Sequence, residues 1–251
     1  MDVQMISKQM IKPSFPTPSH LQNMSISLMD QLVSPRTVPH IFYYYYSANG
    51  NYQGAHSTEH VERQKSLMEK SLSEILTLYY PLAGRYIKEN HLINCNDEGV
   101  EYVEALVNGQ LSQILHGEIE PKELNRFVPD EVEESATSAL FAIQINIFKC
   151  GGLAIGVRLS HRIVDAYTFS LFMNGWAKAC KLGNINDAIV PNFECGILFP
   201  PIDISGYELP PLSKSKYKSD QVVTKRLVFD AKTISKLKAD HQAAMRLNCK
   251  P

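Results

Sequence analysis

Two runs of alternating apolar and polar residues between positions 139 and 160 form the clearest pattern in the chain. The apolar positions are Phe141, Ile143, Ile145 and Ile147 in the first run, and Leu153, Ile155, Val157 and Leu159 in the second. Alternation with a period of two is typical of strands that bury one face. Because the runs flank a Cys-Gly-Gly segment, they predict a β-hairpin.

The length of the hairpin loop decides the strand register. A two-residue Gly-Gly loop would pair Ile145 with Arg158 and so place a cation on the apolar face. A three-residue loop, residues 150–152, pairs Ile145 with Val157 instead. Since the buried face must remain apolar, we expect the three-residue loop, with one glycine in the left-handed conformation.

The rest of the chain predicts a mixture of helices and strands. Apolar residues at helical spacing predict helices over 58–79, 166–180 and 233–244 and a short one over 106–116. Short β-branched and aromatic runs predict strands over 41–46, 91–95, 100–104 and 222–229. The strand over 41–46 contains four consecutive tyrosines, and without interleaved basic residues we expect it to be buried. A long connection containing prolines is expected over 181–219.

Composition excludes several classes of protein. The chain has 251 residues, 44% of them hydrophobic and 20% charged, with a formal net charge of −1. This balance argues against nucleic-acid binding, which needs clustered Lys and Arg, and provides no polybasic membrane patch. The N-terminus has no continuous apolar segment typical of a signal peptide, and the most apolar run, residues 139–148, is half the length that spans a bilayer. We therefore expect a soluble cytoplasmic protein.

The cysteines indicate neither a disulfide framework nor a metal site. The five cysteines are Cys95, Cys150, Cys180, Cys195 and Cys249. Their number is odd and none forms a CxxC pair, so we expect reduced thiols and no metal. A catalytic pair of Cys150 with His161 is also excluded, because eight strand residues place them about 26 Å apart.

The candidate chemistry lies in His161 and Asp165, between the end of a predicted strand and the start of a helix. An imidazole titrates near neutral pH, which suits a general base. A carboxylate at the helix start can cap the helix and hold the turn, which keeps His161 directed outward. On spacing alone, the alternative is a surface histidine beside a helix-capping aspartate, because HxxxD matches often arise by chance.

The residues around this motif resemble a known family over a much longer segment than HxxxD itself. The segment FKCGGLAIGVRLSHRIVDA, residues 148–166, resembles the HxxxD region of plant BAHD acyltransferases. Further segments match that family in kind and order: KPSFPTP (12–18), SISLMD (25–30), YYPLAGR (79–85), NCNDEG (94–99), PNF (191–193), FPP (199–201), KRLVFD (225–230) and ISKLK (234–238). The sequence is most similar to the vinorine-synthase-like group, whose members acetylate hydroxyls of alkaloids and related specialised metabolites.

This resemblance implies a fold and a reaction. The implied fold class is α/β, and more narrowly an α+β two-layer fold like that of chloramphenicol acetyltransferase. Residues 1–200 would form an acyltransferase domain. Residues 201–251 would form a crossover segment and the start of a second domain. His161 would deprotonate the hydroxyl of a small-molecule acceptor, which attacks the thioester of an acyl-CoA co-substrate, expected to be acetyl-CoA. Asp165 would support the motif structurally, and no permanently bound cofactor is implied. The full-length family implies a monomer.

The sequence also departs from the family. The family's second motif, Asp-Phe-Gly-Trp-Gly, is absent, since the only tryptophan is Trp176. The resemblance therefore covers the first half of the family, and the last nine residues do not resemble it. Two functions remain open: an acyl-CoA-dependent O-acyltransferase, or a catalytically incomplete half-enzyme that binds a ligand or a partner chain. A Cys- or Ser-dependent hydrolase is a third alternative. For the chain by itself, we expect slow turnover and association through exposed apolar surface.

Overall fold

The computed structural model describes residues 1–33, 37–44, 58–117, 120–131, 135–204, 227 and 229–248. Residue contacts divide the chain into two compact units, Met1–Pro210 and Pro211–Pro251. The domain boundary expected between residues 200 and 201 stays a prediction. The first unit holds the sheets and the HxxxD motif, and the second contains helix α7 (Ala231–Asn248).

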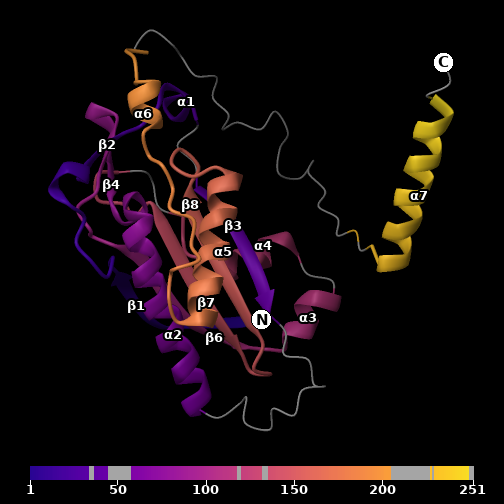
Figure 1. The fold of residues 1–251 in the computed structure, drawn as a ribbon. Coiled ribbons are helices and arrows are strands. Elements are labelled where there is room, and N and C mark those ends of the chain that lie inside the picture. Colours follow the sequence, from indigo (N-terminus) through magenta and orange to yellow (C-terminus); the bar gives the residue numbers. More distant parts are fainter. Residues whose placement is uncertain are drawn as a thin grey trace. The chain divides into compact units, whose positions relative to one another are not determined.

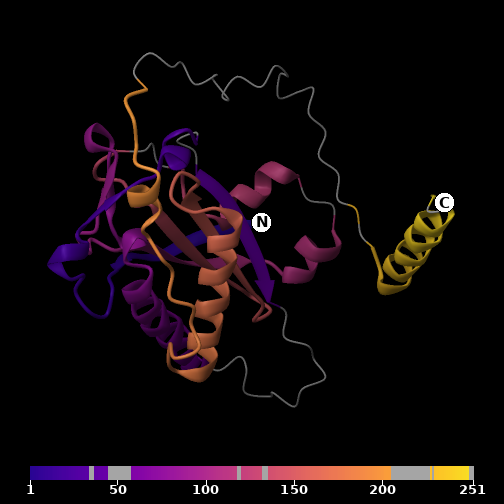
Figure 2. The same ribbon diagram turned by 45° about the horizontal axis from the view of Figure 1, so that its top comes forward.

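A five-stranded mixed sheet forms the centre of the first unit (Figures 1 and 2). Its strand order is β1 (Asp2–Ile11), β6 (Val100–Asn108), β7 (Phe141–Phe148), β8 (Leu153–Ser160) and β3 (Thr37–Tyr44). Only β6 and β7 are parallel, and the other neighbouring pairs are antiparallel.

A second, smaller sheet holds strands β2 (Asn23–Ser25), β5 (Leu92–Asn94) and β4 (Arg85–Ile87). The strands predicted over 91–95 and 100–104 are both present, as β5 and β6, but they belong to different sheets. Between them, Asp97 and Gly99 have φ angles of 54° and 94°. This turn redirects the chain from one sheet to the other instead of closing a hairpin.

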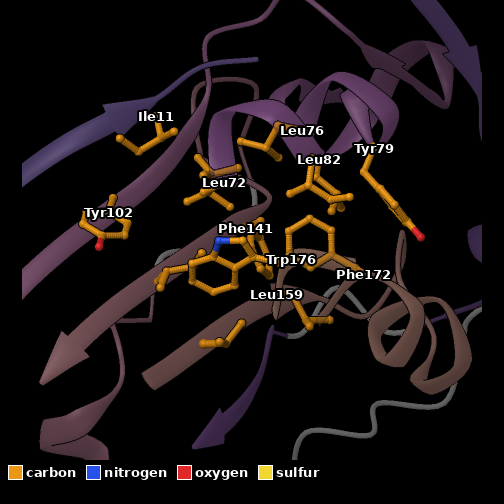
Figure 3. Packing of buried hydrophobic residues seen from close by; sticks show 14 of the residues in the cluster. Ile11, Leu72, Leu76, Tyr79, Leu82, Tyr102, Phe141, Leu159, Phe172 and Trp176 are labelled. Atoms are coloured by element: carbon orange, nitrogen blue, oxygen red, sulfur yellow. The ribbon is translucent and has the colours of Figure 1, made fainter. Parts of the chain in front are cut away.

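Two long helices cover one face of the large sheet and enclose the main core (Figure 3). Helices α2 (Thr58–Leu78) and α5 (Ala166–Leu182) confirm the helices predicted over 58–79 and 166–180. The predicted apolar face of α5 is also confirmed, since Phe169, Phe172 and Trp176 are buried. The Trp176 Nε1–H donates to the Met68 carbonyl at 3.1 Å and to Ser71 Oγ at 3.1 Å, so it joins α5 to α2.

The opposite face of the sheet is partly covered by α3 (Leu111–His116), α4 (Pro121–Leu124) and the short helix η4 (Asn125–Phe127). The polar residues that alternate along β7 are therefore not exposed. Asn146 is fully buried and its amide donates to the carbonyls of Phe127 at 2.8 Å and Ala154 at 3.1 Å. The short helix expected over 106–116 starts only at Leu111, because β6 continues to Asn108 between two partner strands.

The predicted hairpin is confirmed, but its predicted register is wrong by two residues. Val157 pairs with Ile143, and Ile145 pairs with Ile155. The Phe148 N–H donates to the Gly152 carbonyl at 2.9 Å, so the loop inside this last bonded pair has three residues, as expected, but they are 149–151 instead of 150–152. Gly151 has a φ of 78°, and a left-handed residue is favoured at the last position of such a loop. Because the error is an even number of residues, Ile145 and Val157 still share the buried face.

The tyrosine-rich strand differs from the expectation of a buried strand. β3 begins at Thr37, pairs only with β8 and forms an edge of the sheet. An edge strand tolerates Pro39, whose nitrogen cannot donate a hydrogen bond. The Tyr44 side chain is 45% exposed, and Tyr45 and Tyr46 lie outside the described residues.

Several elements, most of them short, have no clear sequence pattern. They are the long edge strand β1, the strands β2 and β4, helix α1 (Leu28–Gln31), helix α6 (Cys195–Leu198) and the 3-10 helices η1 (Ser19–Leu21), η2 (Tyr80–Ala83) and η3 (Lys88–Asn90). Helix α6 interrupts the connection expected over 181–219. The helix predicted over 233–244 is confirmed within α7, and the strand predicted over 222–229 lies largely outside the described residues.

Candidate functional site

The HxxxD motif forms a tight turn between β8 and α5. The backbone N–H groups of Ile163 and Val164 both donate to the Ser160 carbonyl, at 3.2 and 3.3 Å. His161 is the first residue of the turn and is exposed, whereas Val164 is buried in the main core. The turn is therefore fixed to the protein on its inner side and presents an imidazole on its outer side.

Asp165 caps helix α5, as its position at the helix start predicts. Its Oδ1 accepts a hydrogen bond from the Thr168 N–H at 2.7 Å, and its backbone is extended, as is usual for a capping residue. The hydrogen bond from the Thr168 N–H lowers the pKa of the Asp165 carboxyl. The Thr168 hydroxyl and, more weakly, the positive charge of His161 act in the same direction. Asp165 is thus directed to the helix terminus.

Arg162, directly after the histidine, is a buried residue of the turn that was not among the predicted site residues. Its side chain is buried, and its Nη1 donates to the backbone carbonyls of Asp30 at 3.3 Å and Gln31 at 3.1 Å. The guanidinium carbon lies 5.1 Å from the centre of the Tyr86 ring. In the sequence, Arg162 stands out only as a charged residue between the histidine and two apolar residues. This pattern does not predict which groups the arginine contacts.

Three of the four described thiols, those of Cys95, Cys150 and Cys180, are poorly placed for nucleophilic catalysis with His161, whereas Cys195 on α6 is exposed. Cys150 lies in the hairpin loop at the far end of β8, where its Sγ accepts a hydrogen bond from the Leu111 N–H at 3.4 Å. Burial raises the pKa of the Cys95 thiol to about 12 and also raises the pKa of Cys180. Ser160 precedes the histidine but is buried, so its hydroxyl is not accessible to a substrate.

A large cavity among the described residues does not include the motif. It has a volume of about 720 Å³ and lies between α2, α5 and the hairpin end of β8, where Met68, Leu153 and Trp176 contribute to its walls. His161 follows the other end of this strand, roughly 23 Å away at the usual rise per residue. The exposed histidine and the cavity therefore lie at different ends of β8. We assign the candidate site to the turn because the turn carries the exposed base.

Exposed apolar side chains lie on helix α1, which contacts the turn, and on the neighbouring helix α6. Helices α1 and α6 lie together at the end of the unit opposite the hairpin loop (Figure 1), and the Leu28 N–H donates to the Phe199 carbonyl at 2.9 Å. Met29, Ile197, Leu198 and Phe199 are between 59% and 76% exposed. We call these four residues the α1–α6 apolar face.

The part of the chain that the structure describes shows neither a metal site nor a membrane-spanning helix. No three His, Cys, Asp or Glu side chains there are arranged so that they could hold a metal ion. No helix there has the length and apolar character needed to cross a membrane.

Comparison with known proteins identifies the family. The model of the Transferase family matches residues 1–251. The chain is 40% identical to an acetyl-CoA-benzylalcohol acetyltransferase of Clarkia breweri, with 96% of this chain and 52% of that protein covered. It is 36% identical to vinorine synthase of Rauvolfia serpentina, with 95% of this chain and 54% of that protein covered. The chain thus spans about half the length of the curated relatives it matches.

The fold supports the same assignment. The crystal structure of vinorine synthase matches with a TM-score of 0.73 and 33% identity, over 95% of this chain and 55% of the other. This match confirms the expected acyltransferase fold of the α+β two-layer type, built here from the large sheet and helices α2 and α5. The chain therefore belongs to the Transferase family, the BAHD acyltransferases.

Proposed function

We propose that this chain supplies the catalytic base of an acyl-CoA-dependent O-acyltransferase. The observation that carries the proposal is the exposed imidazole of His161 on the turn between β8 and the capped helix α5. The names of the relatives support the reaction class, since one is an acetyl-CoA-benzylalcohol acetyltransferase and another a salutaridinol 7-O-acetyltransferase. We propose acetyl-CoA as the donor and a hydroxyl of a plant specialised metabolite, such as an alkaloid, as the acceptor, in the cytoplasm.

The reaction needs one residue that moves a proton. The His161 imidazole takes the proton of the acceptor hydroxyl while the oxygen attacks the thioester carbonyl. The resulting tetrahedral oxyanion re-forms its carbonyl as the carbon–sulfur bond breaks. The leaving thiolate takes the proton from the imidazolium, which regenerates the base and releases CoA and the ester. No covalent intermediate on the protein is required.

Asp165 supports this reaction without contacting the reacting atoms. Its carboxylate is committed to the N-terminus of α5 through Thr168, so its role is to hold the turn. This arrangement agrees with the structural role that the resemblance implies for the motif aspartate.

The alternative function is a catalytically incomplete half that binds a ligand or a partner chain. The α1–α6 apolar face, beside the catalytic turn, favours this alternative, because exposed apolar patches commonly mark interaction sites. It is also compatible with the first proposal if a second half of the protein covers this face.

Product analysis tests the proposal. The chain is incubated with acetyl-CoA and a panel of alcohols that includes benzyl alcohol, alone and with the second half of a relative appended, and the ester is identified by mass spectrometry. We expect an ester whose formation requires both substrates, with more product when the second half is present. If no ester forms with any alcohol in either form, the transferase proposal is wrong, and binding of acetyl-CoA or of the added half, measured by calorimetry, decides the alternative.

A further inference from the structure

The buried cation of the HxxxD turn is the feature that the proposed chemistry leaves unused. Arg162 is 8% exposed, although His161 before it and Asp165 after it are both exposed. Removing a cation from water is costly unless it gains strong partners. The burial of Arg162 within the motif therefore needs a specific explanation.

The partners of Arg162 are the last carbonyls of helix α1. Its Nη1 lies 3.3 Å from the Asp30 oxygen and 3.1 Å from the Gln31 oxygen, and the guanidinium packs on the ring of Tyr86. The final carbonyls of a helix have no partner within the helix, and a cation at this end is favourable. The Gln31 carbonyl thus gains a charged donor, and the Asp30 carbonyl accepts from the Val33 N–H at 3.1 Å as well as from the arginine.

Helix α1 is itself held by hydrogen bonds at both ends. At its start, Ser27 and Asp30 form a reciprocal capping box. At its end, the buried amide of Gln31 forms two hydrogen bonds with Ile202, donating to its carbonyl at 2.8 Å and accepting from its N–H at 3.1 Å. The Gln31 side chain also lies 3.2 Å from the His91 ring nitrogen. A continuous set of hydrogen bonds thus runs from the segment at Ile202, through α1, to the catalytic turn.

We propose that Arg162 is a positioning residue for His161, which fixes the imidazole by fastening its turn to α1 and, through Gln31, to the segment at residue 202. This proposal rests on the proposed function, because it assumes that His161 is the base and that the rate of acyl transfer depends on where the imidazole lies. Displacement of a catalytic group by about 1 Å can cost roughly 10²-fold in rate. The flanking turn residues Ile163 and Val164 report on this anchor because their N–H groups bond to Ser160.

The test uses the 251-residue chain with Arg162→Met, which removes the donors but keeps an apolar stem, and Arg162→Lys, which keeps one cationic donor. Arg63→Met, at an exposed position on α2, is the matched control. Amide hydrogen exchange of Ile163 and Val164 is measured first. We expect exchange about tenfold faster in Arg162→Met, because a hydrogen bond to a charged group is lost, with a smaller change in Arg162→Lys and none in Arg63→Met.

Transfer kinetics separate positioning from a purely structural role. We expect kcat to fall about 10–100-fold in Arg162→Met while the KM for acetyl-CoA stays within about twofold, with partial recovery in Arg162→Lys. Unchanged exchange at Ile163 and Val164, or unchanged kcat despite faster exchange, overturns the inference. If neither the parent chain nor the chain with the second half of a relative appended forms an ester, the proposed function fails, and the exchange rates, with recovery in Arg162→Lys, still decide whether Arg162 holds the turn.

Discussion

His161 and Asp165 lie four residues apart in the motif, yet the structure gives them different environments. The imidazole is exposed, whereas the carboxylate is bonded to the first turn of α5. The sequence predicted this division from the position of Asp165 at a helix start. It could not predict the carbonyls that Arg162 contacts, because these lie more than 130 residues away in a helix of only four residues.

The first prediction concerns Asp165→Ala. Loss of an N-cap typically destabilises a protein by about 1 kcal/mol, so we expect a lower melting temperature at neutral pH together with reduced transfer activity. The control is Asp187→Ala, at an exposed turn position, which should melt like the parent chain. Equal melting temperatures for the parent and Asp165→Ala would show that the cap does not hold the turn.

The second prediction follows from the lowered pKa of Asp165. A carboxyl whose pKa is lower in the folded state stabilises the protein above its unfolded pKa, about 3.9, and this contribution is lost as the pH falls through the folded pKa. The stability difference between the parent and Asp165→Ala should therefore be constant near neutral pH and decrease at acidic pH below about 4. Chemical unfolding at a series of pH values measures it, and a difference that grows as the pH falls would contradict the sign.

At the level of elements, the hairpin shows which structural features the alternation of apolar and polar residues can predict. Alternation identified both strands, the shared buried face and the loop length, because these depend on local spacing. The exact loop position depends on which residue takes the left-handed conformation, and two adjacent glycines left this open. The structure assigns it to Gly151, at a φ of 78°.

The third prediction tests this loop assignment. Gly151→Val forces a β-branched residue into the left-handed region, at a cost of roughly 1–2 kcal/mol. Gly151→Asn should cost less, because asparagine tolerates this conformation. Urea unfolding of the two variants compares them directly, and equal stabilities would mean that residue 151 does not need a positive φ.

Edge strands and short elements were the least predictable parts of the fold. β1 exposes residues on both faces along most of its length, so it lacks the period-two pattern of a half-buried strand. β3 was expected to be buried because of its aromatic residues, but its position at the edge depends on which strands neighbour β8. Sequence order alone does not specify this arrangement.

On the scale of the first unit, the α1–α6 apolar face is an exposed surface near the HxxxD turn. Its residues Met29, Ile197, Leu198 and Phe199 belong to α1 and to the end of α6, and α1 accepts a hydrogen bond from Arg162 of that turn. The fourth prediction is that the chain associates through this face, and that the double variant Ile197→Ser with Leu198→Ser lowers the associated fraction measured by light scattering. The control is Leu182→Ser, at the end of α5, where the side chain is 51% exposed. If Leu182→Ser reduces association as much as the double variant does, the face is not specific.

The central claim is that His161 is the base of an acyl transfer, and the most direct test is ester formation by His161→Ala compared with the parent chain. We predict a rate about 10²–10⁴-fold lower, in a variant that melts at the same temperature as the parent. His20→Ala, which removes another exposed imidazole, should keep the parent rate. Both variants are assayed with acetyl-CoA and a responsive alcohol, alone and with the second half of a relative appended. Unchanged ester formation by a folded His161→Ala protein would contradict the account.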